Sequence, residues 1–276
     1  MNEYLRCGRF RLALDRPLVM GIVNITPDSF SDGGRFLDPG AAIAHARELI
    51  DEGADILDLG AESTRPGAQP VSAAEEIGRL APVLDALRDA PLPVSVDTMK
   101  PEVMRAALDR GAAMINDVGA LAAPGALDAV AASGCGVCLM HMQGEPRTMQ
   151  AAPHYDDVVG EVKAFLAARV EACERAGIER ERIVIDPGFG FGKTVEHNFA
   201  LLRGLPQLAQ LGLPLLAGWS RKSSLGKITG REPQQRLAAS LAAALLALQR
   251  GARILRVHDV RETRDVIAVW QAAEKR

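Results

Sequence analysis

The chain of 276 residues has no excess of charge of either sign, since 32 Lys and Arg stand against 35 Asp and Glu. A net charge of −3 offers little attraction to the phosphates of nucleic acids or to an anionic membrane. No apolar run reaches the length of a membrane span, and the N-terminus shows no secretory signal pattern. We therefore expect no nucleic acid and no membrane as partners, although a few local cations can still hold a small anion.

Cysteine is also scarce, with four in the chain. So few cysteines are typical of a reducing compartment, and we expect a cytoplasmic location. Cys135 and Cys138 form a CxxC, but a spacing of three along a strand places side chains on opposite faces. Core packing is therefore the favoured interpretation of this pair, with a metal or redox role as the alternative.

Familiar nucleotide-binding and nucleophile motifs are missing. The spacing of Gly188, Gly190 and Gly192 is not GxGxxG, and Pro187 stands where a P-loop before Lys193 would begin with glycine. We interpret this run as a loop that approaches a ligand closely, with Phe191 as an aromatic wall. The chain also offers no obvious Ser/His/Asp or Cys/His triad.

What the chain does contain is an alternation of apolar, strand-like runs with Ala- and Leu-rich helical stretches. Such alternation predicts a parallel sheet covered by helices, and about eight units favour closure into a barrel. The expected fold is α/β, a single (β/α)₈ TIM barrel over residues 1–276 with a short N-terminal β-hairpin within 1–17. Strands are expected at 18–24, 54–60, 93–97, 113–117, 136–141, 182–186, 214–219 and 253–258. Helices are expected at 39–52, 72–89, 101–110, 124–133, 156–176, 195–210, 233–250 and 261–273.

Polar residues stand at the ends of these apolar strands, where a barrel of this kind places its ligand site. Asp97, Asn116, Asp186 and Lys222 would be costly to bury unless they pair with one another or with a ligand. Carboxylate and amide groups suit a flat heterocycle with several N–H donors and ring acceptors. A purely structural salt bridge between the two aspartates and Lys222 is the alternative.

A second group of strand-end residues suits a phosphate or pyrophosphate. It combines guanidinium, imidazole, amide and hydroxyl groups, from Asn24, Thr64, Arg221, Arg256 and His258. The amide oxygen of Asn24 can also ligate Mg²⁺ beside phosphate oxygens and water. The loop after Asn24 mixes hydroxyls, carboxylates and glycines, which favours a mobile active-site loop. His45, His154 and His197 are expected on helices or beside them, in contact with solvent.

Taken together, these segments resemble the dihydropteroate synthase family, in the family's order and over nearly the whole chain. The matching segments are GIVNITPDSFSDGG (21–34), ESTRPGA (62–68), VDTMKPEV (96–103), INDV (115–118), CLMHMQGEPRTMQ (138–150), DPGFGFGK (186–193), SRKS (220–223) and RVHDV (256–260). The resemblance implies an enzyme that condenses 6-hydroxymethyl-7,8-dihydropterin pyrophosphate with p-aminobenzoate, giving 7,8-dihydropteroate and pyrophosphate. It also implies sulfonamides as competitors and a homodimer formed through the later helices.

The resemblance assigns roles position by position. The pterin pyrophosphate would be bound by Thr64, Asp97, Asn116, Asp186, Lys222, Arg256 and His258. The p-aminobenzoate pocket would be formed by Phe30, Arg65, Pro66, Phe191 and Ser223, next to Lys222. Asp97, Lys222 and Asp32 would be the catalytic residues, and Asn24 would hold Mg²⁺. One departure is Ala61, where many relatives have a second glycine after Gly60.

Two alternatives share parts of this pattern. A pterin-binding methyltransferase that serves a corrinoid protein would need the pterin-type Asp and Asn positions, but not the SRKS and RVH segments. A noncatalytic pterin-binding barrel would be expected to have lost Asn24, Lys222, Arg256 or His258, and all four are present.

Overall fold

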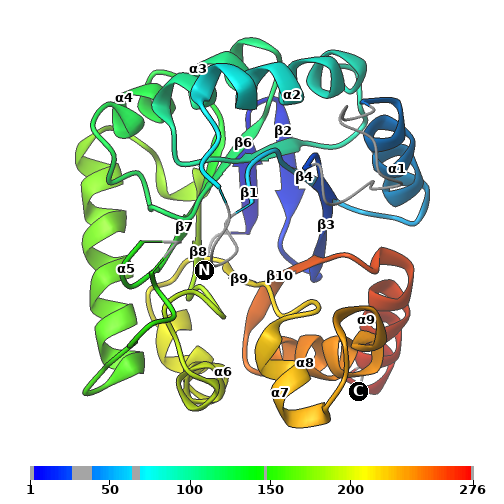
Figure 1. Cartoon of the computed structure of the whole chain (residues 1–276), viewed down its shortest axis with the longest axis vertical. Coiled ribbons are helices and arrows are strands. Elements are labelled where there is room, and N and C mark those ends of the chain that lie inside the picture. The colour runs from blue at the N-terminus through cyan, green and yellow to red at the C-terminus, as the bar shows by residue number, and fades with distance from the viewer. Residues whose placement is uncertain (1–2, 27–38, 64–68, 146–147, 275–276) are drawn as a thin grey trace.

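A computed structural model of the chain describes residues 3–26, 39–63, 69–145 and 148–274. Eight parallel strands close into a barrel in the order β10-β3-β4-β5-β6-β7-β8-β9 (Figure 1). This confirms the predicted TIM barrel, and most strands lie within two residues of their expected bounds. The barrel strands are β3 (Leu18–Asn24), β4 (Ile56–Gly60), β5 (Val94–Asp97), β6 (Met114–Asp117), β7 (Gly136–Met140), β8 (Ile183–Asp186), β9 (Leu215–Ala217) and β10 (Ala252–Val257).

Helices surround the barrel and cover the outward faces of its strands (Figure 1). They are α1 (Pro39–Asp51), α2 (Ala73–Ala86), α3 (Pro101–Asp109), α4 (Ala126–Ala131), α5 (Val158–Arg175), α6 (Val195–Ala209), α7 (Ser223–Thr229), α8 (Leu237–Gln249) and α9 (Val260–Glu274). The helix expected at 233–250 begins only at Leu237, because a 3₁₀ turn over Pro233–Gln235 precedes it. The short helix α7 between β9 and α8 was not expected.

Local sequence signals set the ends of these helices. The Ser72 hydroxyl accepts a hydrogen bond from the Glu75 backbone N–H at 3.2 Å, as expected of a helix N-cap. Pro101 occupies the first turn of α3, where a missing N–H costs nothing. Gly53 and Gly111 follow α1 and α3 with φ values of +94° and +95°, a conformation that favours glycine. The chain can therefore leave each helix sharply and enter the next strand.

The N-terminal hairpin, predicted from the sequence, closes one end of the barrel. Its strands β1 (Tyr4–Cys7) and β2 (Phe10–Ala13) pair antiparallel, and Leu5 and Cys7 are fully buried. These side chains pack against the lower layer of the barrel interior, which is the layer at the N-terminal ends of the strands. That cluster comprises Leu5, Cys7, Leu14, Leu18, Met20, Ile56, Ala113, Met114, Cys138, Val184, Leu216 and Ile254. The end at the N-termini of the strands is thus sealed by apolar packing.

The cysteine pair behaves as core. Cys138 belongs to the apolar cluster inside the barrel, whereas Cys135 belongs to the cluster between strands and helices. All four cysteines are buried and unpaired, so the CxxC spacing forms no disulfide. None of the helices that the structure describes has the length and apolar character needed to cross a membrane.

Candidate active site

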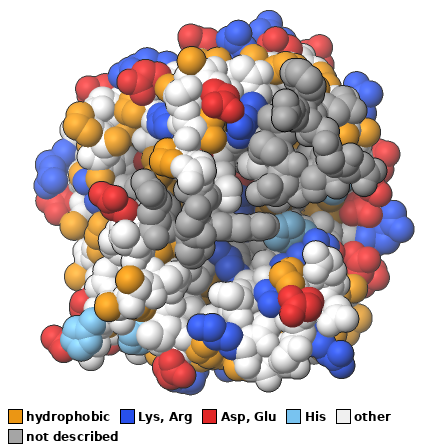
Figure 2. Space-filling model, in the orientation of Figure 1, with side chains coloured by type: hydrophobic (Ala, Val, Ile, Leu, Met, Phe, Trp, Pro, Cys, Tyr) orange, Lys and Arg blue, Asp and Glu red, His pale blue; other side chains and the backbone are white. Residues whose placement is uncertain are grey.

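The open end of the barrel gathers polar side chains from strands that are far apart in the sequence. Asn24, Asp97, Asp117 and Asp186 are the last residues of β3, β5, β6 and β8. Asn116 is only 4% exposed and Asp186 only 6% exposed, so both reach into the interior. Lys, Arg and His side chains show near the middle of the face in Figure 2. The structure therefore brings Asn24, Asp97, Asn116 and Asp186 to one mouth.

Arg256 of β10 is the centre of this mouth. Its Nε donates to Asp58 Oδ2 at 2.6 Å, and its Nη2 donates to Asp97 Oδ2 at 3.0 Å. The Asn116 Nδ2 also donates to Asp58 Oδ2, at 3.0 Å. One guanidinium therefore joins β4 and β5 across the barrel, and the Asn116 amide of β6 shares its acceptor Asp58.

This network links two groups that the sequence analysis described separately, since Arg256 of the anion-binding group pairs with Asp97 of the other group. It also adds Asp58, which the sequence analysis did not select. Asp58 is fully buried in the middle of β4, and its Oδ1 has no hydrogen-bond partner among the described residues. A lone carboxylate inside an apolar strand was the available signal, because such a charge is rarely buried without a partner.

Burial raises the pKa of Asp97 to about 7, while the positive charge of Arg256 pulls it down. The pKa of Arg256 is raised, since the attraction of Asp58 and Asp97 outweighs its own burial. Burial also raises the pKa of Asp186, against the Gly188 N–H bond and the charge of Lys222. The mouth thus concentrates carboxylates that a ligand with several N–H donors can satisfy.

The glycine-rich loop after β8 packs closely against neighbouring protein segments. Gly188 N donates to Asp186 Oδ1 at 2.7 Å. Gly188 has a φ of +70°, and a Cβ there would clash with the carbonyl oxygen of His141. The ring of Phe191 lies 4.3 Å from Lys222 Nζ, a cation–π distance. Phe191 and Lys222 therefore form one surface.

Lys193 is buried under this loop and bonds its backbone. It is 3% exposed, and its Nζ lies 2.9 Å from the Phe191 carbonyl oxygen and 3.0 Å from His141 Nδ1. Burial, reinforced by Lys193, lowers the pKa of His141 to about 3, so its neutral ring accepts this hydrogen bond. Burial lowers the pKa of Lys193 to about 7.

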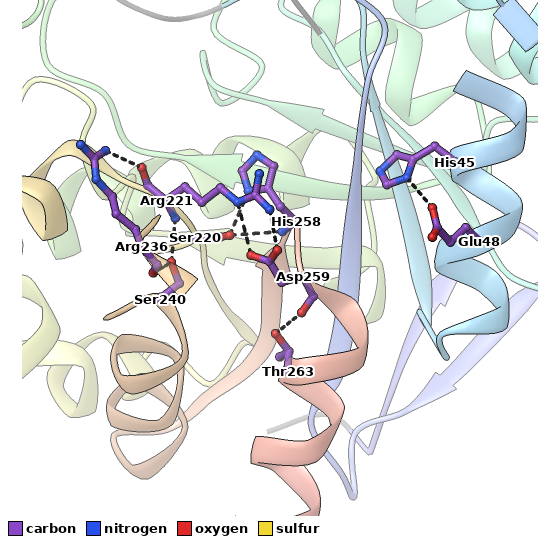
Figure 3. Close-up of polar contacts among 9 residues, drawn as sticks. All are labelled: His45, Glu48, Ser220, Arg221, Arg236, Ser240, His258, Asp259 and Thr263. Carbon is purple, nitrogen blue, oxygen red and sulfur yellow. Dashed lines mark hydrogen bonds and ion pairs between the residues drawn. The ribbon is translucent and has the colours of Figure 1, made fainter. Parts of the chain in front are cut away.

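His258 follows β10 and is held by Ser220 (Figure 3). Ser220 Oγ accepts from the His258 backbone N–H at 3.2 Å and lies 2.9 Å from His258 Nδ1. Ser220 therefore holds both the backbone and the ring of His258 in place. An imidazole N–H positioned in this way is suited to a phosphate oxygen.

Arg221, between Ser220 and Lys222, has an uncommon backbone conformation with φ of +58°. Ser240 Oγ accepts from its backbone N–H at 3.0 Å, and Arg236 donates to its carbonyl at 3.0 Å (Figure 3). Its guanidinium pairs with Asp259 at 2.5 Å. The Asp259 carboxylate would therefore compete with an anionic ligand for the Arg221 guanidinium.

The remaining predicted residues divide into two sets. Asn24 is half-buried at the mouth, and Ser223 is exposed at the first position of α7. Phe30, Asp32, Thr64, Arg65 and Pro66 lie outside the described residues. Among the histidines outside the site, His154 is exposed as expected, with 85% of its side chain accessible. His197 is not simply solvated, since its ring and backbone complete a capping box with Thr194.

Comparison with known proteins agrees with this geometry. A family model described as "Pterin binding enzyme" matches residues 20–258. The dihydropteroate synthase of Escherichia coli (strain K12) is 50% identical over 262 residues, covering 95% of this chain and 93% of that protein. The structure of Xanthomonas albilineans dihydropteroate synthase with 4-aminobenzoic acid superposes with a TM-score of 0.94 at 57% identity, covering both chains fully. Burkholderia cenocepacia dihydropteroate synthase, complexed with 7,8-dihydropteroate, gives 0.90 at 52% identity, covering 98% of this chain and 96% of the other.

Proposed function

The chain belongs to the dihydropteroate synthase family, and we propose that it condenses 6-hydroxymethyl-7,8-dihydropterin pyrophosphate with p-aminobenzoate. The C–O bond to pyrophosphate breaks, and a C–N bond forms between the pterin methylene carbon and the aniline nitrogen, which loses one proton. The observation that carries this proposal is the convergence of Asp97, Asn116, Asp186 and Arg256 at one barrel mouth. The SRKS and RVH segments, both present in the chain, argue against a corrinoid methyltransferase. The presence of Lys222, Arg256 and His258 argues against a noncatalytic barrel.

Pterin recognition is assigned to the buried acceptors of the mouth. Asp186 accepts paired N–H bonds from the 2-amino group and a ring nitrogen, and each such charged bond is worth roughly 1.5–3 kcal/mol. Asp97 and Asn116 are paired residues of the adjacent strands β5 and β6, at the same mouth. Arg256 and His258 are assigned to the pyrophosphate, where they stabilise the negative charge that grows on the leaving group.

The pterin assignment is tested by calorimetry with Asp186→Ala and the matched Asp186→Asn, which keeps the size of the side chain. Both variants should fold, and neither should bind the pterin pyrophosphate measurably. The parent chain, mixed with both substrates and Mg²⁺, should give a product with the mass of dihydropteroate. Wild-type pterin affinity in a folded Asp186→Ala protein would show that the assignment is wrong.

Mg²⁺ is proposed as the cofactor, held by Asn24 together with oxygens of the pyrophosphate. The amide oxygen of Asn24 is a hard ligand, and Mg²⁺ commonly takes one or two protein ligands beside substrate phosphates. The described residues contain no group of three His, Cys, Asp or Glu that could hold a metal alone. When bound, the ion would supply positive charge to the departing phosphate. Asn24→Ala should therefore raise the Mg²⁺ concentration needed for half-maximal turnover, whereas unchanged dependence would count against this ligand.

The p-aminobenzoate site is proposed at the Phe191–Lys222 surface, with Ser223 beside it and with Phe30, Arg65 and Pro66 as further members. An aromatic ring and the stem of a lysine suit the flat aniline ring. Sulfonamides share that shape and are expected to compete. If loops ordered by pyrophosphate complete this site, p-aminobenzoate should bind better when pyrophosphate and Mg²⁺ are present. Equal affinity in both calorimetric titrations would contradict the ordered sequence of binding.

A homodimer is proposed through α8, whose solvent side is apolar. Leu237 and Leu246 are each 37% exposed, and Leu241 and Leu245 lie half-buried along the same helix. An exposed apolar stripe of this kind is typical of a protein interface. Leu246→Glu should shift the chain from dimer to monomer in ultracentrifugation, while Ala44→Glu on the exposed side of α1 should not. The same sedimentation in both variants would remove α8 from the interface.

A cytoplasmic location is proposed from the four unpaired cysteines.

A further inference from the structure

The loop that carries Phe191 is held by side chains along its length. Gln150 donates to the Gly190 carbonyl, Tyr155 to the Gly192 carbonyl and Lys193 to the Phe191 carbonyl. All of these bonds tie the loop to its own residues or to the segment after β7. A fourth side chain, Asn198, differs from these because it also ties the loop to the start of α7.

Asn198 lies in the first turns of α6 and is 1% exposed. Its Oδ1 accepts from the Gly190 backbone N–H at 2.7 Å. Its Nδ2 donates to the Thr194 carbonyl at 2.8 Å and to Ser224 Oγ at 3.0 Å. A single buried amide therefore bonds the β8–α6 loop and the start of α7 at the same time.

The two segments that Asn198 joins are those that meet at the proposed p-aminobenzoate surface. Gly190 directly precedes Phe191, and Ser224 directly follows Lys222 and Ser223. The segments also touch above the amide, since a Cβ on Gly190 would lie 3.2 Å from Lys222 Cδ. A shift of one segment against the other would therefore separate Phe191 from Lys222, whose ring and ammonium lie 4.3 Å apart.

We propose that Asn198 is a positioning residue that fixes the β8–α6 loop against α7, so that Phe191 and Lys222 form one wall for p-aminobenzoate. The inference rests on the proposed condensation of a pterin pyrophosphate with p-aminobenzoate. The chemistry of the amide explains the residue type. An aspartate would keep the acceptor for the Gly190 N–H but lose the donor to the Thr194 carbonyl. A leucine would leave Gly190 and Ser224 without their bonds, whereas the Thr194 carbonyl would keep its bond from the backbone N–H of residue 198.

Ser224→Ala is the sharpest test, because it removes only the bond between the two segments. We expect the KM for p-aminobenzoate to rise about 3- to 10-fold, the change that one buried hydrogen bond is worth. The calorimetric Kd for the pterin pyrophosphate should stay within about twofold, because Asp186 and Asn116 keep their contacts. Asn198→Leu should raise the same KM further, and Asn198→Leu combined with Ser224→Ala should be no worse than Asn198→Leu alone. Asn198→Asp should raise it less than Asn198→Leu, because its carboxylate still accepts from Gly190 and can accept from the Ser224 hydroxyl.

The matched control is Thr229→Val, which removes a hydroxyl bond to the Leu225 carbonyl at the far end of α7. It should lower the melting temperature slightly and leave both substrates' constants unchanged. If Ser224→Ala behaves like this control, Asn198 only stabilises the fold and the inference is overturned, even if Asn198→Leu does not fold. A wild-type chain that neither turns over nor binds p-aminobenzoate overturns the proposed function as well.

Discussion

The two ends of the barrel interior differ completely, although the same strands form both. On four strands, the inward side chain changes from apolar to polar within a single step of two residues. These steps are Ile56 to Asp58, Met114 to Asn116, Val184 to Asp186 and Ile254 to Arg256. Side chains two apart on a strand point to the same face, so each strand carries one residue for the sealed end and one for the open end.

The contrast shows how stability and chemistry are separated along the barrel axis. The hairpin seals the lower layer with Leu5 and Cys7, and its energy comes from removing apolar area from water. The upper layer places Asp58 and Arg256 in the same interior, where charges are stable only as hydrogen-bonded partners. We therefore expect changes in the lower layer to affect folding alone, and changes in the upper layer to affect turnover.

Arg256→Met should have the largest effect, because it leaves Asp58 and Asp97 without their cation. Removing one partner of a buried ion pair costs about 3–5 kcal/mol of unfolding free energy. Turnover should fall by roughly 10²- to 10³-fold, since a donor to the leaving pyrophosphate is lost. Denaturant unfolding and turnover on one preparation measure both. The double variant with Asp58→Asn should regain stability but no activity. A fully active Arg256→Met enzyme with wild-type unfolding free energy would contradict both roles.

Lys222→Met should separate chemistry from stability. Methionine keeps most of the lysine stem and its packing against Phe191, but removes the charge. Turnover should fall by about two orders of magnitude, equivalent to about 3 kcal/mol of transition-state stabilisation, with little change in melting temperature. A large loss of melting temperature with the folded fraction still active would instead support the structural salt bridge considered from the sequence.

Leu5→Ala tests the sealed end. Leu5 is fully buried in the hairpin, and truncating such a side chain costs about 2–4 kcal/mol of unfolding free energy. The kcat per folded molecule should stay unchanged at a temperature where the variant is folded. Leu12→Ala, a partly buried position on the same hairpin, should cost less. A fall of kcat in the folded Leu5→Ala protein would show that the two layers are coupled.

Lys193 gives a smaller effect that depends on pH. The unfolded chain keeps this proton up to a pH of about 10, whereas the folded chain releases it above a pH of about 7 because burial lowers the pKa. The unfolded state therefore binds more protons in this range, and rising pH favours the folded state. Between pH 7 and pH 8 the wild type should gain about 1 kcal/mol relative to Lys193→Met. Parallel stability curves for the two proteins would show that the Lys193 pKa is not lowered.

The sequence predicted the open end better than it predicted the partners within it. Apolar strands that end in polar residues identify Asp97, Asn116 and Asp186, because the parallel sheet brings those ends together. Asp58 and Asn198 were missed for the opposite reason. Asp58 lies inside a strand and Asn198 inside a helix, and only the three-dimensional contacts with Arg256 and Ser224 give them their partners. The short helix α7 was missed because its seven residues are too few for a periodic pattern.

Ala61→Gly should have the smallest effect, and it examines the one departure from the family pattern. Ala61 is fully buried at the end of β4, and its carbonyl accepts from Arg79 Nη1 at 2.8 Å. Glycine can keep this bond, so turnover and the KM of both substrates should not change. The unfolding free energy should fall by about 0.5–1 kcal/mol, because glycine loses more conformational entropy on folding. Arg79→Met is the comparison variant, since it removes from the side of α2 the bond that Ala61→Gly keeps. If Ala61→Gly changed a KM instead, the methyl group of Ala61 would itself affect substrate binding at the open end. The residues that control turnover would then include an apolar one beside the charged residues of the upper layer.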